Sequence, residues 1–145
     1  MKDYKTENIV NLALSGHAAS GKTCLAESLL LVAKSINKKG NIQSGSTLSD
    51  YRKQEIDHQH SISMSVLNCE FLDKKINIID TPGYMDFVGE VKAALKVVDT
   101  SAIVINASEG IEALTELSWD YSKEYKNAKC FIINMCDRDL SKFDT

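Results

Sequence analysis

The run GHAASGKT, at Gly16–Thr23, limits the possible folds of this chain more than any other part of its sequence. It follows the apolar stretch Ile9–Leu14, which is typical of a strand buried on both faces. Apolar residues then recur at helical spacing from Cys24 to Ile36. A glycine-rich turn between a buried strand and a helix is the setting of a phosphate-binding loop. We therefore predict a P-loop rather than a turn that only caps the helix.

Short apolar runs alternate with amphipathic helical periods through the rest of the chain. Continuous apolar runs at 102–107 and 130–134 predict two more buried strands. Apolar residues at helical spacing cover 88–98 and 114–125. This alternation predicts an α/β fold of the P-loop NTPase class, a doubly wound and mostly parallel sheet with helices on both faces.

One strand pair and one long loop depart from that alternation. Residues 61–66 alternate strictly between polar and apolar side chains, so we expect a half-exposed, antiparallel edge strand there. It is expected to pair with 75–79, and 68–74 would form the connection between them. The polar stretch 38–59 shows neither period, and a loop of that length in a compact domain is usually functional or disordered.

Length and charge limit the classes of function. The 145 residues, 43% of them hydrophobic, suffice for a single domain spanning 1–145. A net charge of -3 provides no basic surface, so no direct DNA binding is expected. No apolar run approaches roughly 18 residues, so we expect a cytoplasmic protein with no membrane contact. Only 135–145 follow the last predicted strand, so the C-terminal part of the domain is expected to be missing.

The residues of the GHAASGKT run have separate parts in holding a nucleotide. Backbone N–H groups at the start of the helix surround the phosphates. Lys22 supplies a point charge to the outer phosphates, and the Thr23 hydroxyl ligates Mg²⁺. The predicted nucleotide-binding residues of this loop are Gly16, His17, Ala18, Ala19, Ser20, Gly21, Lys22, Thr23 and Cys24.

A second motif, DTPG at 80–83, directly follows the apolar run 76–79. Asp80 is therefore expected at the carboxyl end of a strand, the edge where α/β sheets bind ligands. Its carboxylate can hold Mg²⁺ through a water, and Gly83 lets the backbone approach a terminal phosphate closely. The alternative is a turn without a ligand, since Asp, Pro and Gly are all common turn residues.

A third motif, NMCD, supplies Asn134, Met135 and Asp137 after the last predicted strand. A carboxylate at Asp137 can accept hydrogen bonds from N1–H and the exocyclic amine of guanine, which adenine does not offer. A site built around such donors rejects a ligand that lacks them. The motif predicts GTP or GDP as the ligand; the alternative is that Asp137 caps a following helix.

Taken together, these segments resemble the translational GTPases, and most closely elongation factor G and its paralogues. The matching segments are Gly16–Thr23, Asp50-Tyr51, Ser61-Ile-Ser, 76–87 and 132–138. By this resemblance 38–61 is the first switch region and 80–87 begins the second. Ser61 stands where the family has a Mg²⁺-binding threonine, although it could instead only begin an exposed strand face. The resemblance implies a Mg²⁺-dependent GTPase with the ribosome as its partner.

The chain departs from the family mainly in residues linked to hydrolysis. Tyr84 stands where the family has a histidine that positions the attacking water, and a phenol cannot act in the same way. Ala18 and His60 replace two apolar gate residues, and Ala19 replaces an aspartate. Met135 replaces a lysine whose stem packs beside guanine, and its apolar side chain can still pack there.

These departures leave three interpretations open. The first is a GTPase with slow intrinsic hydrolysis, faster on the ribosome, whose candidate catalytic residues are Lys22, Gly83 and Tyr84. The second is a guanine-nucleotide-binding module whose GTP state is a docking switch, and the third is a fragment of a ribosome-protection-type factor. His58 or His60 could bring an imidazole to the site, although solvated loop histidines are the simpler interpretation.

Overall fold

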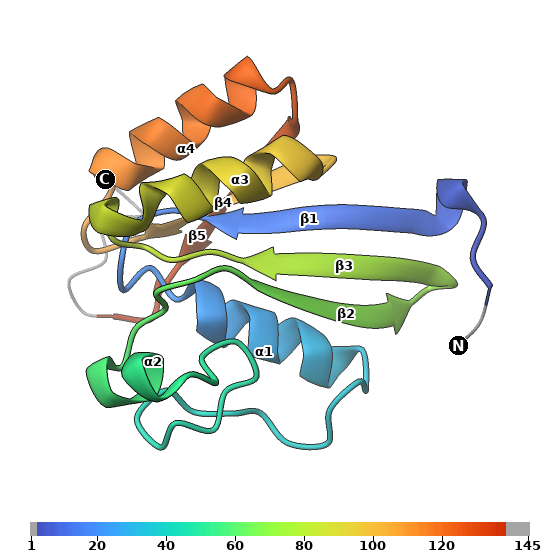
Figure 1. The fold of residues 1–145 in the computed structure, drawn as a ribbon, viewed down its shortest axis with the longest axis horizontal. Coiled ribbons are helices and arrows are strands. Elements are labelled where there is room, and N and C mark those ends of the chain that lie inside the picture. Colours follow the sequence, from blue (N-terminus) through green and yellow to red (C-terminus); the bar gives the residue numbers. More distant parts are fainter. Residues whose placement is uncertain (1–2, 139–145) are drawn as a thin grey trace.

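A computed structural model describes residues 3–138 and shows a five-stranded sheet with helices on both faces (Figure 1). The ends of the predicted 1–145 domain, residues 1–2 and 139–145, lie outside the described part. The strands are β1 (Ile9–Ser15), β2 (Ser65–Phe71), β3 (Lys74–Asp80), β4 (Thr100–Asn106) and β5 (Ala128–Asn134). The helices are α1 (Lys22–Val32), α2 (Lys53–His58), α3 (Val88–Val97) and α4 (Ala113–Glu124), with 3-10 turns η1 (Thr6–Asn8) and η2 (Met85–Phe87). Within residues 3–138, no helix has the length and apolar character that crossing a membrane requires.

The strand order is β2-β3-β1-β4-β5, and every neighbouring pair is parallel except β2 with β3. This arrangement confirms the predicted mostly parallel α/β sheet with an antiparallel edge strand. Because β1 and β3 are parallel neighbours, their carboxyl ends meet at one edge, on the side where α2 lies in Figure 1. The loops that carry the GHAASGKT and DTPG motifs are therefore adjacent.

The sheet separates two apolar layers. On one face Ala13 packs with Val91 and Leu95 of α3 and with Leu114 of α4. On the other face Leu14 packs with residues of α1, including Ala26 and Leu30. Successive side chains of a strand point to opposite faces, so a strand with both faces covered has a continuous apolar sequence.

The predicted start of the edge strand was wrong. β2 begins at Ser65 and continues to Phe71, so much of the predicted connection 68–74 is strand and the turn is only two residues long. Before β2, the N–H groups of Ile62 and Ser63 both donate to the Glu55 carboxylate at 3.1 Å. A buried carboxylate therefore takes the hydrogen bonds that a partner strand would have accepted.

One helix was not predicted, and another ends earlier than predicted. The polar stretch 38–59 contains α2, which is too short to show an apolar period and begins where the Arg52 N–H donates to the Glu55 carboxylate at 3.2 Å. Helix α1 ends at Val32 rather than at Ile36, because Lys34 adopts the left-handed conformation with a φ of 58°.

Candidate functional site

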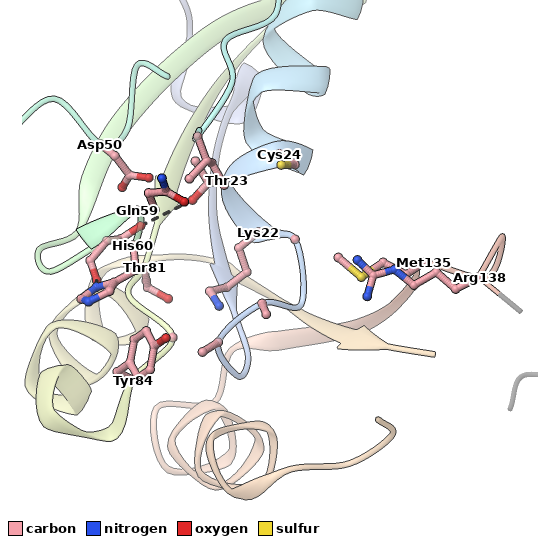
Figure 2. Close-up of a pocket in the computed structure, with 16 residues that line it drawn as sticks. Lys22, Thr23, Cys24, Asp50, Gln59, His60, Thr81, Tyr84, Met135 and Arg138 are labelled. Atoms are coloured by element: carbon pink, nitrogen blue, oxygen red, sulfur yellow. Dashed lines mark hydrogen bonds between the residues drawn. The ribbon is translucent and has the colours of Figure 1, made fainter. Parts of the chain in front are cut away.

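A pocket of about 300 Å³ opens at the carboxyl edge of the sheet, and Figure 2 shows the residues that line it. Four parts of the chain form its walls: the loop and helix start after β1, the polar segment between α1 and β2, the loop after β3, and the turn after β5. The predicted site residues that line it are Ala18, Ala19, Gly21, Lys22, Thr23, Cys24, Ser61, Gly83, Tyr84 and Met135. The structure thus brings most of the predicted site residues together.

The remaining predicted residues lie behind or beside the pocket wall. The Asn134 amide donates to the Ser20 carbonyl at 2.9 Å and so ties the end of β5 to the P-loop. Nε2 of His17 lies 3.3 Å from a carboxylate oxygen of Glu112. Gly16 passes so close to the backbone of Val104 that a Cβ would collide with it. Asp137 lies in an exposed turn after β5 and does not line the pocket.

The P-loop is held in shape by glycine and by a buried lysine. Gly21, with a φ of 92°, caps α1, and a Cβ there would collide with the Asn134 side chain. Lys22 is buried, and its Nζ donates to the His17 carbonyl at 2.6 Å. Burial lowers the pKa of Lys22 to about 8, against the opposing effects of Asp80 and Glu112. The lysine and the α1 N-terminus together offer positive potential to an anion.

Asp80 ends β3 beneath this loop and is 1% exposed. Neither of its carboxylate oxygens has a hydrogen-bond partner of good geometry. Burial raises the pKa of Asp80 to about 6, although the nearby hydroxyls of Thr23 and Ser49 and the charge of Lys22 lower it. A buried carboxylate whose oxygens have no protein partner is suited to bind a ligand that brings positive charge.

Asp50 is a second buried carboxylate beside the pocket, and the sequence motifs did not indicate it as a ligand. Its Oδ1 has no hydrogen-bond partner, and burial raises its pKa. Asp50-Tyr51 was one of the segments that resemble the translational GTPases, but no period or glycine pattern accompanies Asp50 and no role was assigned to it. The fold of the loop places the Asp50 carboxylate near Ser61 and Asp80.

These oxygen atoms form a set that fits Mg²⁺. The hydroxyls of Thr23 and Ser61 lie 3.5 Å apart, and the carboxylates of Asp80 and Asp50 have unpartnered oxygens nearby. Among residues 3–138, no group of three or more His, Cys, Asp or Glu side chains forms a metal cage by itself. Mg²⁺ usually binds through one or two carboxylates together with the phosphates of a substrate, and this set matches that pattern.

The other end of the pocket is formed by the turn after β5. Met135 and Arg138 line it and lie next to each other in Figure 2, across the pocket from His60 and Tyr84. Met135 has a φ of 62°, and its Cε lies 3.5 Å from where a Cβ on Gly21 would be. Arg138 is a pocket residue that was not among the predicted site residues, because it follows the NMCD motif.

A P-loop between β1 and α1, an oxygen set for Mg²⁺ and a pocket at the strand ends define a P-loop nucleotide-binding domain. The model of the elongation factor Tu GTP-binding domain family matches residues 7–145, and the chain belongs to that family. This finding confirms the resemblance that the motifs predicted.

Individual proteins agree with this membership. Elongation factor G 2 of Borreliella burgdorferi is 34% identical over 131 residues, which are 90% of this chain and 20% of that protein. The tetracycline resistance protein TetO of Streptococcus mutans is 36% identical over 131 residues, again 90% of this chain and 20% of that protein. A crystal structure of a Thermus thermophilus protein superimposes with a TM-score of 0.87 and 31% identity, covering 89% of this chain and 20% of that one. The chain thus spans about a fifth of the length of these relatives.

Proposed function

We propose that this chain binds a guanine nucleotide with Mg²⁺ and hydrolyses GTP slowly, as the G domain of an elongation-factor-G-like GTPase that the ribosome stimulates in the cytoplasm. The observation that carries the proposal is that Lys22 lines one pocket with the hydroxyls of Thr23 and Ser61, with the buried, unpartnered carboxylate of Asp80 behind its wall. A phosphate with a bound metal ion would complement both kinds of group, because the phosphate would pair with the Lys22 ammonium and the metal ion would pair with the oxygen atoms.

The nucleotide would lie along the pocket between its two ends. Lys22 and the N–H groups at the start of α1 would hold the phosphates. Thr23 and Ser61 would ligate Mg²⁺ directly, and Asp80 would hold it through water, with Asp50 as a further oxygen donor. Asn134, Met135 and Asp137 would hold the guanine, and the Asn134 bond to Ser20 supports this because it links base and phosphate parts.

Hydrolysis of GTP depends mainly on positioning and on stabilising charge at the terminal phosphate. A Cβ on Gly83 would lie 2.6 Å from both the Lys22 Nζ and the Ala18 Cα, so the loop after β3 touches the phosphate-binding end of the pocket. We therefore propose 80–87 and 38–61 as switch regions. Their contacts to phosphate and Mg²⁺, at Gly83 and Ser61, would be lost after hydrolysis.

The ribosome enters the proposal through the relatives. Elongation factor G 2 and the other elongation factors are named for protein synthesis, and this chain matches them over nearly its whole length. The pocket itself supports only the nucleotide chemistry. The proposed interaction with the ribosome therefore needs a measurement separate from nucleotide binding.

The test combines binding and turnover in the full chain. Fluorescent GDP should bind in the presence of Mg²⁺, GTP should displace it, and ATP should displace it at least about 100-fold less well. Phosphate release in a single turnover should proceed at about 10⁻⁴ to 10⁻² per second alone and faster with ribosomes. Absence of GDP binding, or equal displacement by ATP, would contradict the proposal. Binding with no effect of ribosomes on turnover would instead support a docking module.

A further inference from the structure

Lys22 and Gly83 mark the terminal-phosphate end of the pocket, since a Cβ added at Gly83 would lie only 2.6 Å from the Lys22 Nζ. A group that orients a water for in-line attack must reach this end from a side chain of the pocket wall. The Thr81 hydroxyl is already committed, since it donates to the Leu14 carbonyl at 2.8 Å in a buried position. Among the described residues that line the pocket, Gln59, His60 and Tyr84 lie on the side of Lys22 away from Met135 and Arg138 in Figure 2, and the rings of His60 and Tyr84 pack together.

His60 and Tyr84 come from separate segments and pack against each other. Their ring centroids are 4.7 Å apart with an angle of 52° between the planes, and Figure 2 shows both on the same side of the pocket. The ring of Phe87, in η2, lies 6.3 Å from that of His60. The imidazole is therefore held between the pocket and two aromatic rings of the loop after β3.

A hydrogen bond orients the imidazole further. Nδ1 of His60 lies 3.3 Å from the carbonyl oxygen of Ser61. Because a carbonyl oxygen can only accept, this contact requires the proton on Nδ1, and in the neutral ring Nε2 is then a free acceptor. The Tyr84 hydroxyl is less restrained than the His60 imidazole. It has no hydrogen bond within the described part of the chain, and the residue is 44% exposed.

We propose that Nε2 of His60 accepts a hydrogen bond from the attacking water, and that the Tyr84 ring is a positioning residue for this imidazole. The inference rests on the proposed function. In the step, the water oxygen bonds to the terminal phosphorus while the bond from that phosphorus to the bridging oxygen breaks. The electron pair of the broken bond remains on the GDP, and both water protons leave with the released phosphate.

The packing of His60 on Tyr84 also suggests how this chain can function with Tyr84 in place of the family's histidine. The side chains of Tyr84 and His60 line the same part of the pocket, and their rings pack against each other there. A group that orients water can therefore come from the segment after α2 while residue 84 supplies packing surface. The two segments need to be in contact for this arrangement, as they are here.

The test compares ring packing with hydrogen bonding at position 60. His60→Phe keeps an aromatic ring against Tyr84 but has no acceptor, whereas His60→Gln keeps an acceptor without the ring. We expect His60→Phe to lower single-turnover hydrolysis by about 10- to 100-fold, and His60→Gln to recover most of that loss. Tyr84→Ala should lower the rate, and Tyr84→Phe, which keeps the ring, should restore it. His58→Phe is the matched control, because His58 stacks on His60 from outside and does not line the pocket.

A binding measurement separates a catalytic role from a structural one. GDP affinity should stay within about twofold in every variant, while affinity for GDP with aluminium fluoride, which mimics the transition state, should fall in His60→Phe in step with the rate. A wild-type rate in His60→Phe, or a loss in Tyr84→Phe as large as in Tyr84→Ala, would overturn the inference and leave the proposed function intact. Absence of GDP binding to the wild-type chain would overturn the proposed function as well.

Discussion

Asp80 and Lys22 are oppositely charged residues buried near the pocket, and burial disfavours the charged form of each side chain. Burial raises the pKa of Asp80 to about 6 and lowers the pKa of Lys22 to about 8, so their mutual attraction does not offset the loss of water. The oxygens of Asp80 have no hydrogen-bond partner. Such a residue contributes to ligand binding at the expense of the stability of the ligand-free protein.

The first prediction concerns the Asp80→Asn variant. Removing the buried charge should stabilise the nucleotide-free protein at neutral pH by about 1–3 kcal/mol, because an amide loses less solvation on burial. The same change should weaken Mg²⁺-dependent GDP binding by about tenfold or more. Urea unfolding without nucleotide and GDP titration with and without Mg²⁺ measure the two effects. Asp73→Asn, in the exposed turn after β2, is the control. Lower stability of Asp80→Asn would show that the carboxylate has a stabilising partner.

At the scale of elements, two buried glutamates hold the long polar segment in place. Glu27, on α1, accepts hydrogen bonds from the N–H groups of Gly40 at 2.8 Å and Leu48 at 2.6 Å. Glu55, on α2, accepts those of Ile62 and Ser63. Both glutamates are 1% exposed. The segment is therefore ordered by charge-assisted bonds to its backbone, without strand pairing or a long helix.

The second prediction concerns Glu27→Gln. An amide keeps the size of the side chain but loses the charge and one acceptor oxygen, so one of the two N–H groups loses its partner. We expect a loss of about 1–3 kcal/mol in the free energy of unfolding, together with faster amide hydrogen exchange at 40–48. Glu116→Gln, on the exposed side of α4, should leave both unchanged. Unaltered exchange in Glu27→Gln would contradict this account of how the segment is held.

At the scale of the whole molecule, the buried charges predict how stability depends on pH. The folded-state pKa of Asp80, about 6, lies above its ordinary value of 3.8, so the folded chain binds more protons between these values. Stability of the nucleotide-free protein should therefore fall as the pH rises from about 4 to 6, by up to roughly 3 kcal/mol from this group. The raised pKa of Asp50 acts in the same direction. Lys22, faced by Asp80 and Glu112, reverses the trend only above about pH 8.

Urea unfolding from pH 4 to 8 tests this third prediction. The difference in stability between Asp80→Asn and the wild type should grow as the pH rises from about 4 to 6 and should level off above pH 6. Parallel curves would show that Asp80 ionises equally in the folded and unfolded states. Saturation with Mg²⁺ and GDP should remove the difference or reverse it, because binding to the folded state alone stabilises it, by about 2.7 kcal/mol at 100 times the dissociation constant.

The sequence predicted the sheet better than the segment before it. The continuous apolar runs of β1 and β4 correctly predicted strands in the interior of the sheet, because helices cover both faces there. The run at 130–134 was wrongly predicted to be buried: β5 is an edge strand, and its residues are exposed or half-exposed. The alternation at 61–66 was misleading, since the Glu55 carboxylate replaces the partner strand there. Helix α2 was missed because a single short turn of helix leaves no periodic signal.

The sequence alone determined the P-loop, its neighbouring strand and helix, and the motifs at the ends of β3 and β5, because each depends on residues that are close together in the chain. Only the tertiary structure decided that Asp50 lies beside Asp80, that Glu27 binds the segment at 40–48, and that His60 packs on Tyr84. The physical reason is that these contacts join residues far apart in sequence, so no local period or propensity reports them. They depend on how the long segment folds back over the sheet edge.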